Sequence, residues 1–399
     1  MKVLLVEPVA TGHRMSLYVR MAVRAALARG WHLKLLTSQA YRLHPAMSSI
    51  RKEGGRNLSI TYGNFPLERG NNLVLNQVKY YLAVRTAFQK LTADFDVVFV
   101  PCLDEMDKAL VAFGSPFGDT PFVAIQTSVK FHRAKLGLGP PSRSDLLYGA
   151  FFKSLLRIAG LRKLLVIDEP FYLNRHKFGI CKDHLLALLH DVGEVKIKVE
   201  KSAARSEVGV SDSEFMILVY GSISDRKGVS LLLRALSLID DVKFCVVLAG
   251  KTSENMRPFV EKLNADFRFN IRVVKRCFFH GDIDEGLVFS AADFVWLGYV
   301  GGSYGSSGVL YQAASTGIPV IATTKGVIGW QNKRYQLGVP IDVSDVSAVA
   351  SEIHRLCVDQ SLRRMLSRNG LECAALHTHR QFGEDICMAL RPESSVERW

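Results

Sequence analysis

Short apolar runs alternate with longer amphipathic stretches along the whole chain. Runs that are apolar almost throughout are typical of strands covered by helices on both faces. The pattern therefore predicts βα units around parallel sheets. The expected strands are Lys2–Val6, His32–Leu36, Val97–Val100, Phe122–Ile125 and Leu164–Ile167 in the first half, and Met216–Val219, Phe244–Leu248, Ile271–Val274, Phe294–Leu297 and Val320–Ala322 in the second.

The chain is longer than one hydrophobic core usually serves, so its 399 residues predict two domains. Apolar periodicity stops at Leu189, and a polar, lysine-bearing connector runs to Glu200. We expect an N-terminal domain over residues 1–190 and a C-terminal domain over 191–376, with a helical pattern at residues 377–399 that crosses back to the first. The predicted fold class is α/β, with two doubly wound Rossmann-like domains facing a central cleft.

The net charge of +13 lies entirely in the first half of the chain. Residues 1–190 hold 26 Lys and Arg against 13 Asp and Glu, while residues 191–399 hold 25 of each kind. Such a field favours an anionic partner, whether lipid headgroups, a pyrophosphate-bearing acceptor or nucleic acid. We disfavour nucleic acid, because no recognition module is present and the basic residues are not interleaved with stacking aromatics.

Several classes of protein are disfavoured by what the sequence lacks. No apolar run is long enough to span a bilayer, and the opening MKVLLVEP is too short to be a secretory signal. The seven cysteines are scattered, without a CxxC pair or a His/Cys cluster at metal-ligand spacing. We therefore expect a cytoplasmic protein with reduced thiols and no metal site.

Two segments place glycine and serine where a predicted strand gives way to a predicted helix: Gly221–Gly228 and Gly301–Thr323. Free N–H groups and the helix dipole at such a junction can hold a phosphate. Two junctions in one domain predict a site for a nucleoside diphosphate.

The second junction continues into a helix expected through Val309–Ser315. Ser306, Ser307 and Gly308 precede it, where glycine permits close approach of the main chain and serine can cap the helix. Gly317 and Pro319 are interpreted as structural, because they end the helix before the next strand.

The segments YGSISDRKGVSLLLRAL, FFHGDIDEGLVFSAADFVWL and SGVLYQAASTGIPVIAT, in this order and spacing, resemble glycosyltransferases of the GT-B fold, most closely the family-4-like group (glycosyl transferases group 1). The resemblance implies a hexosyltransferase-like enzyme that uses a UDP- or GDP-sugar and no other cofactor or metal. It implies a glycan, lipid-linked or other hydroxyl acceptor, and bacterial surface polysaccharide or glycolipid synthesis, in the cytoplasm or at the inner face of the plasma membrane. Whether the anomeric configuration is retained stays open.

The family's G-R-L-x-x-x-K-G motif falls on Gly221, Ser222, Ile223, Lys227 and Gly228. The resemblance implies that Lys227 pairs with the donor diphosphate. Ser222 replaces the family's arginine, and Arg226 is expected to supply the lost charge. Lys227 and Arg226 are thus candidate catalytic groups that stabilise the leaving group, with Lys227 expected to be exposed in a cleft. The alternative is a solvated helix cap with exposed basic residues.

The family also carries two glutamates, which in this register fall on Tyr304 and Gln312. Both carboxylates are absent. The resemblance implies that Gln312 accepts hydrogen bonds from the donor ribose through its amide oxygen, and that Tyr304 offers a hydroxyl near the donor sugar. We include both residues in the expected donor site, together with Ser306, Ser307, Gly308 and Val309.

Two further candidates lie in the first half. Gly12 follows the first strand, where an open α/β sheet places ligands, although the alternative is a plain strand-to-helix turn. His132 is the candidate catalytic histidine, able to orient or deprotonate an acceptor hydroxyl. The family's histidine could instead align with Gln126, and a surface histidine is the remaining alternative.

Asp145–Gly160 predicts a helix with Leu147, Phe151, Ser154, Leu155 and Ile158 on one face. A helix covering the sheet is the favoured interpretation, and a contact with an anionic membrane is the alternative. For the whole chain, a nucleotide-sugar-binding protein without transferase activity and a UDP-sugar epimerase of the same fold remain alternatives to a transferase.

Overall fold

The computed structural model describes residues 1–9, 14–66, 73–180, 183–277, 281–302 and 305–392. The chain forms two compact units. The first comprises residues 1–135, 141–190 and 379–399, and the second comprises residues 136–140 and 191–378. The division at residues 190/191 lies in the polar connector, and the C-terminal segment joins the first unit.

Among the described residues, the first unit contains a sheet of seven strands in the order β3-β2-β1-β4-β5-β6-β7, all parallel. Its strands are β1 (Lys2–Glu7), β2 (His32–Ser38), β3 (Leu58–Gly63), β4 (Val97–Val100), β5 (Phe122–Gln126), β6 (Leu161–Val166) and β7 (Leu186–Leu188). Its helices are α1 (Arg20–Leu27), α2 (Pro45–Gly54), α3 (Leu73–Gln89), α4 (Asp107–Phe113), α5 (Asp145–Leu155), α6 (Glu169–Leu173) and α15 (His379–Leu390).

The second unit repeats this plan, with seven described strands in the order β10-β11-β9-β8-β12-β13-β14, parallel except for β10 with β11. Its strands are β8 (Phe215–Tyr220), β9 (Phe244–Ala249), β10 (Asp266–Arg268), β11 (Ile271–Arg276), β12 (Phe294–Leu297), β13 (Val320–Thr323) and β14 (Gly338–Ile341). Its helices are α7 (Lys201–Val208), α8 (Val229–Leu236), α9 (Arg257–Lys262), α10 (Asp282–Ala291), α11 (Gly308–Thr316), α12 (Gly326–Tyr335), α13 (Val346–Val358) and α14 (Gln360–Ala374).

All ten predicted strands are present, within three residues of their expected ends. The strands that the apolar pattern missed are β3, β7, β10 and β14, which occupy the edges of the two sheets. An edge strand has only one neighbour and is less deeply buried, so it does not need a continuous apolar run. The exposed DFR sequence of β10 and the proline in β14 follow from this.

Each sheet has one point where the strand order reverses direction. In the first unit this switch point lies between β1 and β4, and in the second it lies between β8 and β12. Ligands of open α/β sheets bind beyond the carboxyl ends of the strands at such points. Both loops after β8 and β12 therefore lead to the place where a ligand of the second unit is expected.

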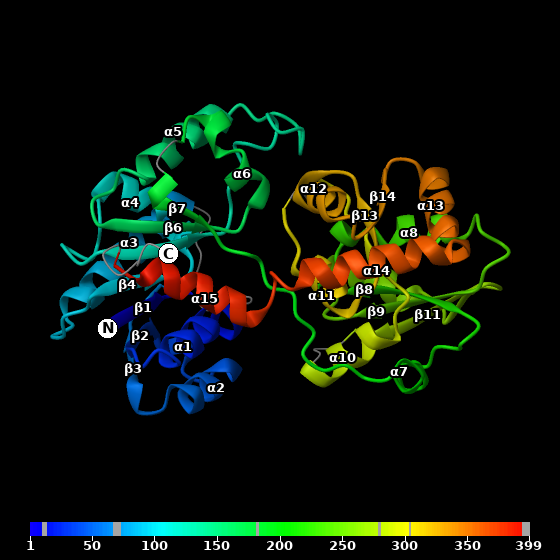
Figure 1. The fold of residues 1–399 in the computed structure, drawn as a ribbon, viewed down its shortest axis with the longest axis horizontal. Coiled ribbons are helices and arrows are strands. Elements are labelled where there is room, and N and C mark those ends of the chain that lie inside the picture. The colour runs from blue at the N-terminus through cyan, green and yellow to red at the C-terminus, as the bar shows by residue number, and fades with distance from the viewer. Residues whose placement is uncertain (10–13, 67–72, 181–182, 278–280, 303–304, 393–399) are drawn as a thin grey trace. The chain divides into compact units, whose positions relative to one another are not determined.

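The C-terminal helix α15 packs within the first unit, where Figure 1 shows it in red among blue and cyan elements. Its Phe382 stacks on Tyr18 with ring centroids 5.4 Å apart. The guanidinium of Arg162, from β6, donates to the Leu390 carbonyl at 3.0 Å. These contacts integrate α15 into the first unit.

Candidate functional site

The loop after β8 is held against the end of β12 by main-chain contacts. The Trp296 indole N–H donates to the Lys227 carbonyl at 2.7 Å, and the Val300 amide donates to the Arg226 carbonyl at 2.9 Å. Trp296 itself is fully buried in β12. The two basic residues of the loop are therefore fixed at the switch point by the core of the sheet.

Gly228 makes this close approach possible. It adopts a left-handed conformation, with φ of 62°, between a 3₁₀ turn at Asp225–Lys227 and the start of α8. A Cβ atom at this position would lie 2.6 Å from the Gly298 carbonyl oxygen. Any other residue would therefore strain the backbone and push the loop away from β12.

The Lys227 side chain points into the unit, with a relative exposure of 2%. Its ammonium donates to the Tyr220 carbonyl at 2.6 Å and to the Tyr299 hydroxyl at 2.9 Å. Burial lowers the pKa of Lys227 below its ordinary value, although the neighbouring Tyr299 opposes the shift. The expectation that Lys227 is exposed was therefore wrong: the buried ammonium is satisfied by protein oxygens.

Tyr299 lies two residues beyond β12 and links Lys227 to the second junction. Its hydroxyl lies 3.0 Å from the Ser307 Oγ. The Arg226 guanidinium lies over its ring, 4.4 Å from the centroid. Burial opposes ionisation of Tyr299, but the charge and hydrogen bond of Lys227, with contributions from Ser307 and Arg226, lower its pKa overall. The ring thus brings together both cations and one serine of the predicted site.

Ser307 occupies the N-cap position of α11, as its extended backbone shows. Within the described chain, its hydroxyl makes no capping hydrogen bond to the first turn and is paired with Tyr299 instead. The helix begins at Gly308, one residue earlier than predicted, so Gly308 and Val309 lie in its first turn. Gly317 ends the helix in a left-handed conformation, as its structural interpretation required.

Gln312, one turn further along α11, joins the same network through a carboxylate. Its amide Nε2 donates to the Glu285 Oε2 at 3.0 Å, and the Tyr220 hydroxyl donates to the same oxygen at 2.8 Å. Tyr220 also provides the carbonyl that holds Lys227. Although α11 carries no carboxylate at position 312, α10 places one beside it.

The sequence reasoning missed three members of this network: Tyr220, Tyr299 and Glu285. Both tyrosines carried a signal, because each puts a polar hydroxyl at or just past the carboxyl end of a buried strand. Glu285 carried no comparable signal, since one acidic residue in the first turn of a helix is commonplace.

The other predicted residues lie around this network or outside the described residues. Ser222 and Ser306 are exposed on the loops after β8 and before α11. Gly12 and Tyr304 lie outside the residues that the structure describes. Their assignments stay predictions.

His132 lies in the first unit and is completely buried. Its Nε2 lies 3.1 Å from the Asp168 Oδ1. The imidazole also packs against Phe131 and Phe171, with the Phe171 ring centroid 5.4 Å away. The interpretation as a surface histidine was therefore wrong, and the catalytic assignment stays a prediction. The alternative, Gln126, is also buried and donates to Asp104.

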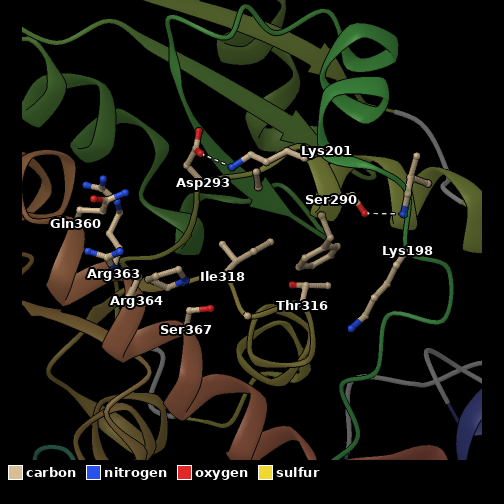
Figure 2. Close-up of a pocket in the computed structure, with 15 residues that line it drawn as sticks. Lys198, Lys201, Ser290, Asp293, Thr316, Ile318, Gln360, Arg363, Arg364 and Ser367 are labelled. Atoms are coloured by element: carbon tan, nitrogen blue, oxygen red, sulfur yellow. Dashed lines mark hydrogen bonds and ion pairs between the residues drawn. The ribbon is translucent and has the colours of Figure 1, made fainter.

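A cavity of about 510 Å³ in the second unit is lined by none of the predicted site residues, although Gly317 and Pro319, interpreted as structural, lie in its wall. Figure 2 shows its lining, with Lys198 and Lys201 on one side and Arg363 and Arg364 of α14 on another. It lies at the amino ends of β12 and β13, the sheet edge opposite Tyr299. Lys201 is paired with Asp293 at 2.7 Å. We therefore base the candidate site on the network, which has the expected topology, and not on the size of a cavity.

Comparison with known proteins follows this division of the chain. Residues 200–372 match the family model described as "Glycosyl transferases group 1". A curated relative named an uncharacterized glycosyltransferase, from Methanocaldococcus jannaschii, is 28% identical over 171 residues, which cover 43% of this chain and 43% of the relative. The chain thus aligns with less than half the length of that relative.

Two solved structures are similar over almost the whole chain. Sucrose-phosphate synthase from Thermosynechococcus elongatus has a TM-score of 0.68 at 18% identity, covering 97% of this chain and 98% of its own. HepE of Anabaena, in complex with UDP and glucose, has a TM-score of 0.62 at 15% identity, covering 99% and 100%. These matches confirm the GT-B fold, and the family match confirms the resemblance that the motifs predicted.

Proposed function

We propose that this protein, whose residues 200–372 carry the domain of the group 1 glycosyl transferases, moves a sugar from a nucleoside diphosphate donor to a hydroxyl acceptor. The family match supports the class of reaction. The observation that supports this proposal most directly lies at the switch point of the second unit. There, hydrogen bonds through Tyr299 connect the buried Lys227 to Ser307 at the N-terminus of α11.

The network suits a leaving diphosphate. Sugar transfer passes through an oxocarbenium-like transition state, so the enzyme must stabilise negative charge on the departing group. Arg226, the hydroxyl of Ser307 and the main-chain N–H groups at Gly308 and Val309 supply positive potential there. Lys227 contributes its charge from behind Tyr299.

The opposite end of the network suits hydroxyl groups. With its Nε2 bound to Glu285, Gln312 keeps its amide oxygen as an acceptor, and Glu285 adds a carboxylate. We assign this end to the ribose of the donor. HepE of Anabaena, in complex with UDP and glucose, supports UDP as the first nucleotide to test, with GDP as the alternative.

The function is tested by calorimetric titration of the whole chain with UDP and GDP, followed by transfer assays with the matching nucleotide-sugars. We expect one nucleoside diphosphate to bind, and sugar to be transferred to a glycan or lipid-linked acceptor. Binding without transfer to any acceptor would favour the binding-protein alternative, and isomerisation without acceptor would favour the epimerase. Absence of binding to both diphosphates would contradict the proposal. The anomeric configuration of the product decides between retention and inversion.

We also infer that the first unit contacts an anionic membrane surface through α5. The helix ends at Leu155 and buries Phe152 and Leu155, which supports the sheet-covering interpretation for that face. The predicted single apolar face was wrong, however, because Leu147 is 72% exposed beside Leu146 at 90%. Arg143, Lys153 and Arg157, on α5 or close to its ends in the sequence, are also exposed. In the described chain no helix is both long and apolar enough to cross a membrane.

Flotation with anionic and with neutral liposomes at low salt tests this surface. We expect the protein to float with anionic liposomes only, and the variant carrying Leu146→Gln and Leu147→Gln to remain at the bottom. Leu43→Gln is the matched control, because Leu43 is 92% exposed elsewhere in the first unit. Equal flotation of all three proteins would refute the assignment.

A further inference from the structure

The position of Lys227 raises a problem for the proposed function. A lysine that binds a diphosphate directly must reach it, yet this side chain is 2% exposed and two of its three N–H groups donate to Tyr220 and Tyr299. Withdrawing the ammonium from these oxygens would leave both without their partner in a buried place, which is costly. Direct contact therefore needs a rearrangement that the hydrogen bonds oppose.

The direction of the hydrogen bonds offers another route. An ammonium has only protons to give, so the Tyr299 oxygen must accept from Lys227 at 2.9 Å. The hydrogen bond of 3.0 Å between the Tyr299 hydroxyl and the Ser307 Oγ can be donated by either oxygen, and the phenolic proton is available for it. When Tyr299 is the donor, Ser307 accepts this bond, and its own proton becomes available to a further acceptor. The chain of donors thus runs from the buried cation outward.

The oxygen of Ser307 does not cap α11 in the described residues. Ser307 stands at the N-cap, where a serine ordinarily uses its oxygen to satisfy an N–H group of the first turn. Over the described residues, no such bond is made. The Ser307 hydroxyl and the first-turn N–H groups therefore lie at the same helix N-terminus, which is suited to an anion.

We propose that Tyr299 is a positioning residue through which Lys227 acts on the donor: Lys227 donates to Tyr299, Tyr299 to Ser307, and Ser307 to an oxygen of the diphosphate. The inference rests on the proposed function and names how that site recognises the phosphate. Successive donors in a buried chain polarise one another, so the lysine charge strengthens the serine as a donor. Arg226, stacked on the same ring, helps to hold the phenol in place.

Tyr299→Phe tests the relay by removing one oxygen and leaving the ring. We expect the affinity for the bound nucleoside diphosphate to fall about tenfold, as for the loss of one charge-assisted hydrogen bond. The affinity for the corresponding nucleoside, which lacks phosphates, should stay unchanged. Tyr335→Phe is the matched control, because it removes a phenolic hydroxyl outside the network in the same unit, and it should leave both affinities unchanged.

A double-mutant cycle with Ser307→Ala separates a relay from two independent contacts. If both residues act in one chain of hydrogen bonds, the variant with both substitutions should bind the diphosphate no more weakly than the single variant with the lower affinity. Ser307 is only half-buried, so Ser307→Ala keeps the test available if Tyr299→Phe fails to fold. In that event Ser307→Ala alone should lower the affinity for the diphosphate about tenfold and leave the affinity for the nucleoside unchanged.

Three results would overturn the relay: unchanged diphosphate affinity in Tyr299→Phe, an equal loss of nucleoside affinity, or additive losses in the cycle. If the unmodified protein binds neither UDP nor GDP, the proposed function fails, and the relay fails with it. If the protein binds a diphosphate and Tyr299→Phe binds it equally well, the relay alone is wrong.

Discussion

The switch points of the two sheets occupy the same place in the same fold, but one buries a charged ammonium and the other a protonated carboxyl. In the second unit the buried group is the Lys227 ammonium, satisfied by Tyr220 and Tyr299. In the first unit it is Glu7, the last residue of β1, which is 1% exposed and accepts from the Val9 amide at 2.9 Å. Burial raises the pKa of Glu7 to about 8, against the influence of nearby Arg14.

The two buried groups differ in what they offer a ligand. Around Lys227, the hydroxyl groups of Tyr299 and Ser307 form hydrogen bonds that lead outward to α11. Around Glu7, the polar groups are paired with one another: Arg14 with Glu105 at 2.6 Å, and Asp104 with the amides of Thr127 and Ser128. The fold sets where a site can form, and the residue types there decide whether it faces a ligand or the protein.

The largest expected effect concerns the buried carboxyl of the first unit. Between pH 4.5 and about 8 the folded state keeps the Glu7 proton and the unfolded state loses it, so this group's contribution to stability is complete below pH 4.5 and declines as pH rises to about 8. Glu7→Gln should abolish that decline. The difference in the free energy of unfolding between the variant and the parent should shift by about 4 kcal/mol in favour of the variant from pH 4.5 to pH 8.

Urea unfolding of both proteins at several pH values between 4.5 and 8 measures this effect. Asp119→Asn, which alters an exposed carboxylate of the same unit, is the matched control and should follow the parent. Parallel stability profiles of Glu7→Gln and the parent would mean that Glu7 is ionised in the folded protein. The contrast between the two switch points would then disappear.

A second, smaller effect is expected at the buried cation. Lys227→Met keeps most of the length of the side chain and removes the charge, so the affinity for the nucleoside diphosphate should fall about 100-fold, or about 2.7 kcal/mol. Alanine is a poorer choice, because at 2% exposure it would leave a cavity and destabilise the unit. Calorimetry with the diphosphate and its nucleoside should show the loss for the diphosphate only.

Lys243→Met provides the comparison for Lys227→Met. Lys243 is exposed immediately before β9, at the opposite edge of the sheet from Lys227. The Lys243→Met variant should bind the diphosphate with the affinity of the unmodified protein. Equal affinities in the two methionine variants would mean that the buried cation takes no part in binding.

The smallest effect is expected at the carboxylate of the network. Glu285→Gln keeps an oxygen that can accept from Tyr220 and Gln312 but removes the negative charge. We expect affinity to fall about threefold, and equally for the diphosphate and the nucleoside, because Glu285 is assigned to the ribose end. A loss confined to the diphosphate, again measured by calorimetry, would move Glu285 to the phosphate end and reverse the orientation of the donor.

The sequence was sufficient for what depends on local pattern. Buried central strands such as β4 and β12 were predicted at their observed bounds, because helices on both faces demand an apolar residue at every position. The left-handed turn at Gly228 also follows from local sequence. The edge strands were missed, since exposure relaxes that demand.

The sequence was insufficient where side chains from distant segments meet. Lys227 and Tyr299 are 72 residues apart, and only the strand order brings them together. A lysine in a polar turn is ordinarily exposed, so its burial could not be expected without its partners. His132 shows the same limit, because only Phe131 of its aromatic neighbours lies in its own loop, while Phe171 comes from α6 and Phe178 from a later turn.

The contacts from Trp296 and Val300 to the carbonyls of the basic loop have a consequence for the cost of binding. They immobilise the loop through the core of the sheet before any ligand arrives. Ordering a flexible loop on association would subtract conformational entropy from the affinity. Here that entropy is already lost during folding, so binding of the proposed donor would not have to order the basic loop.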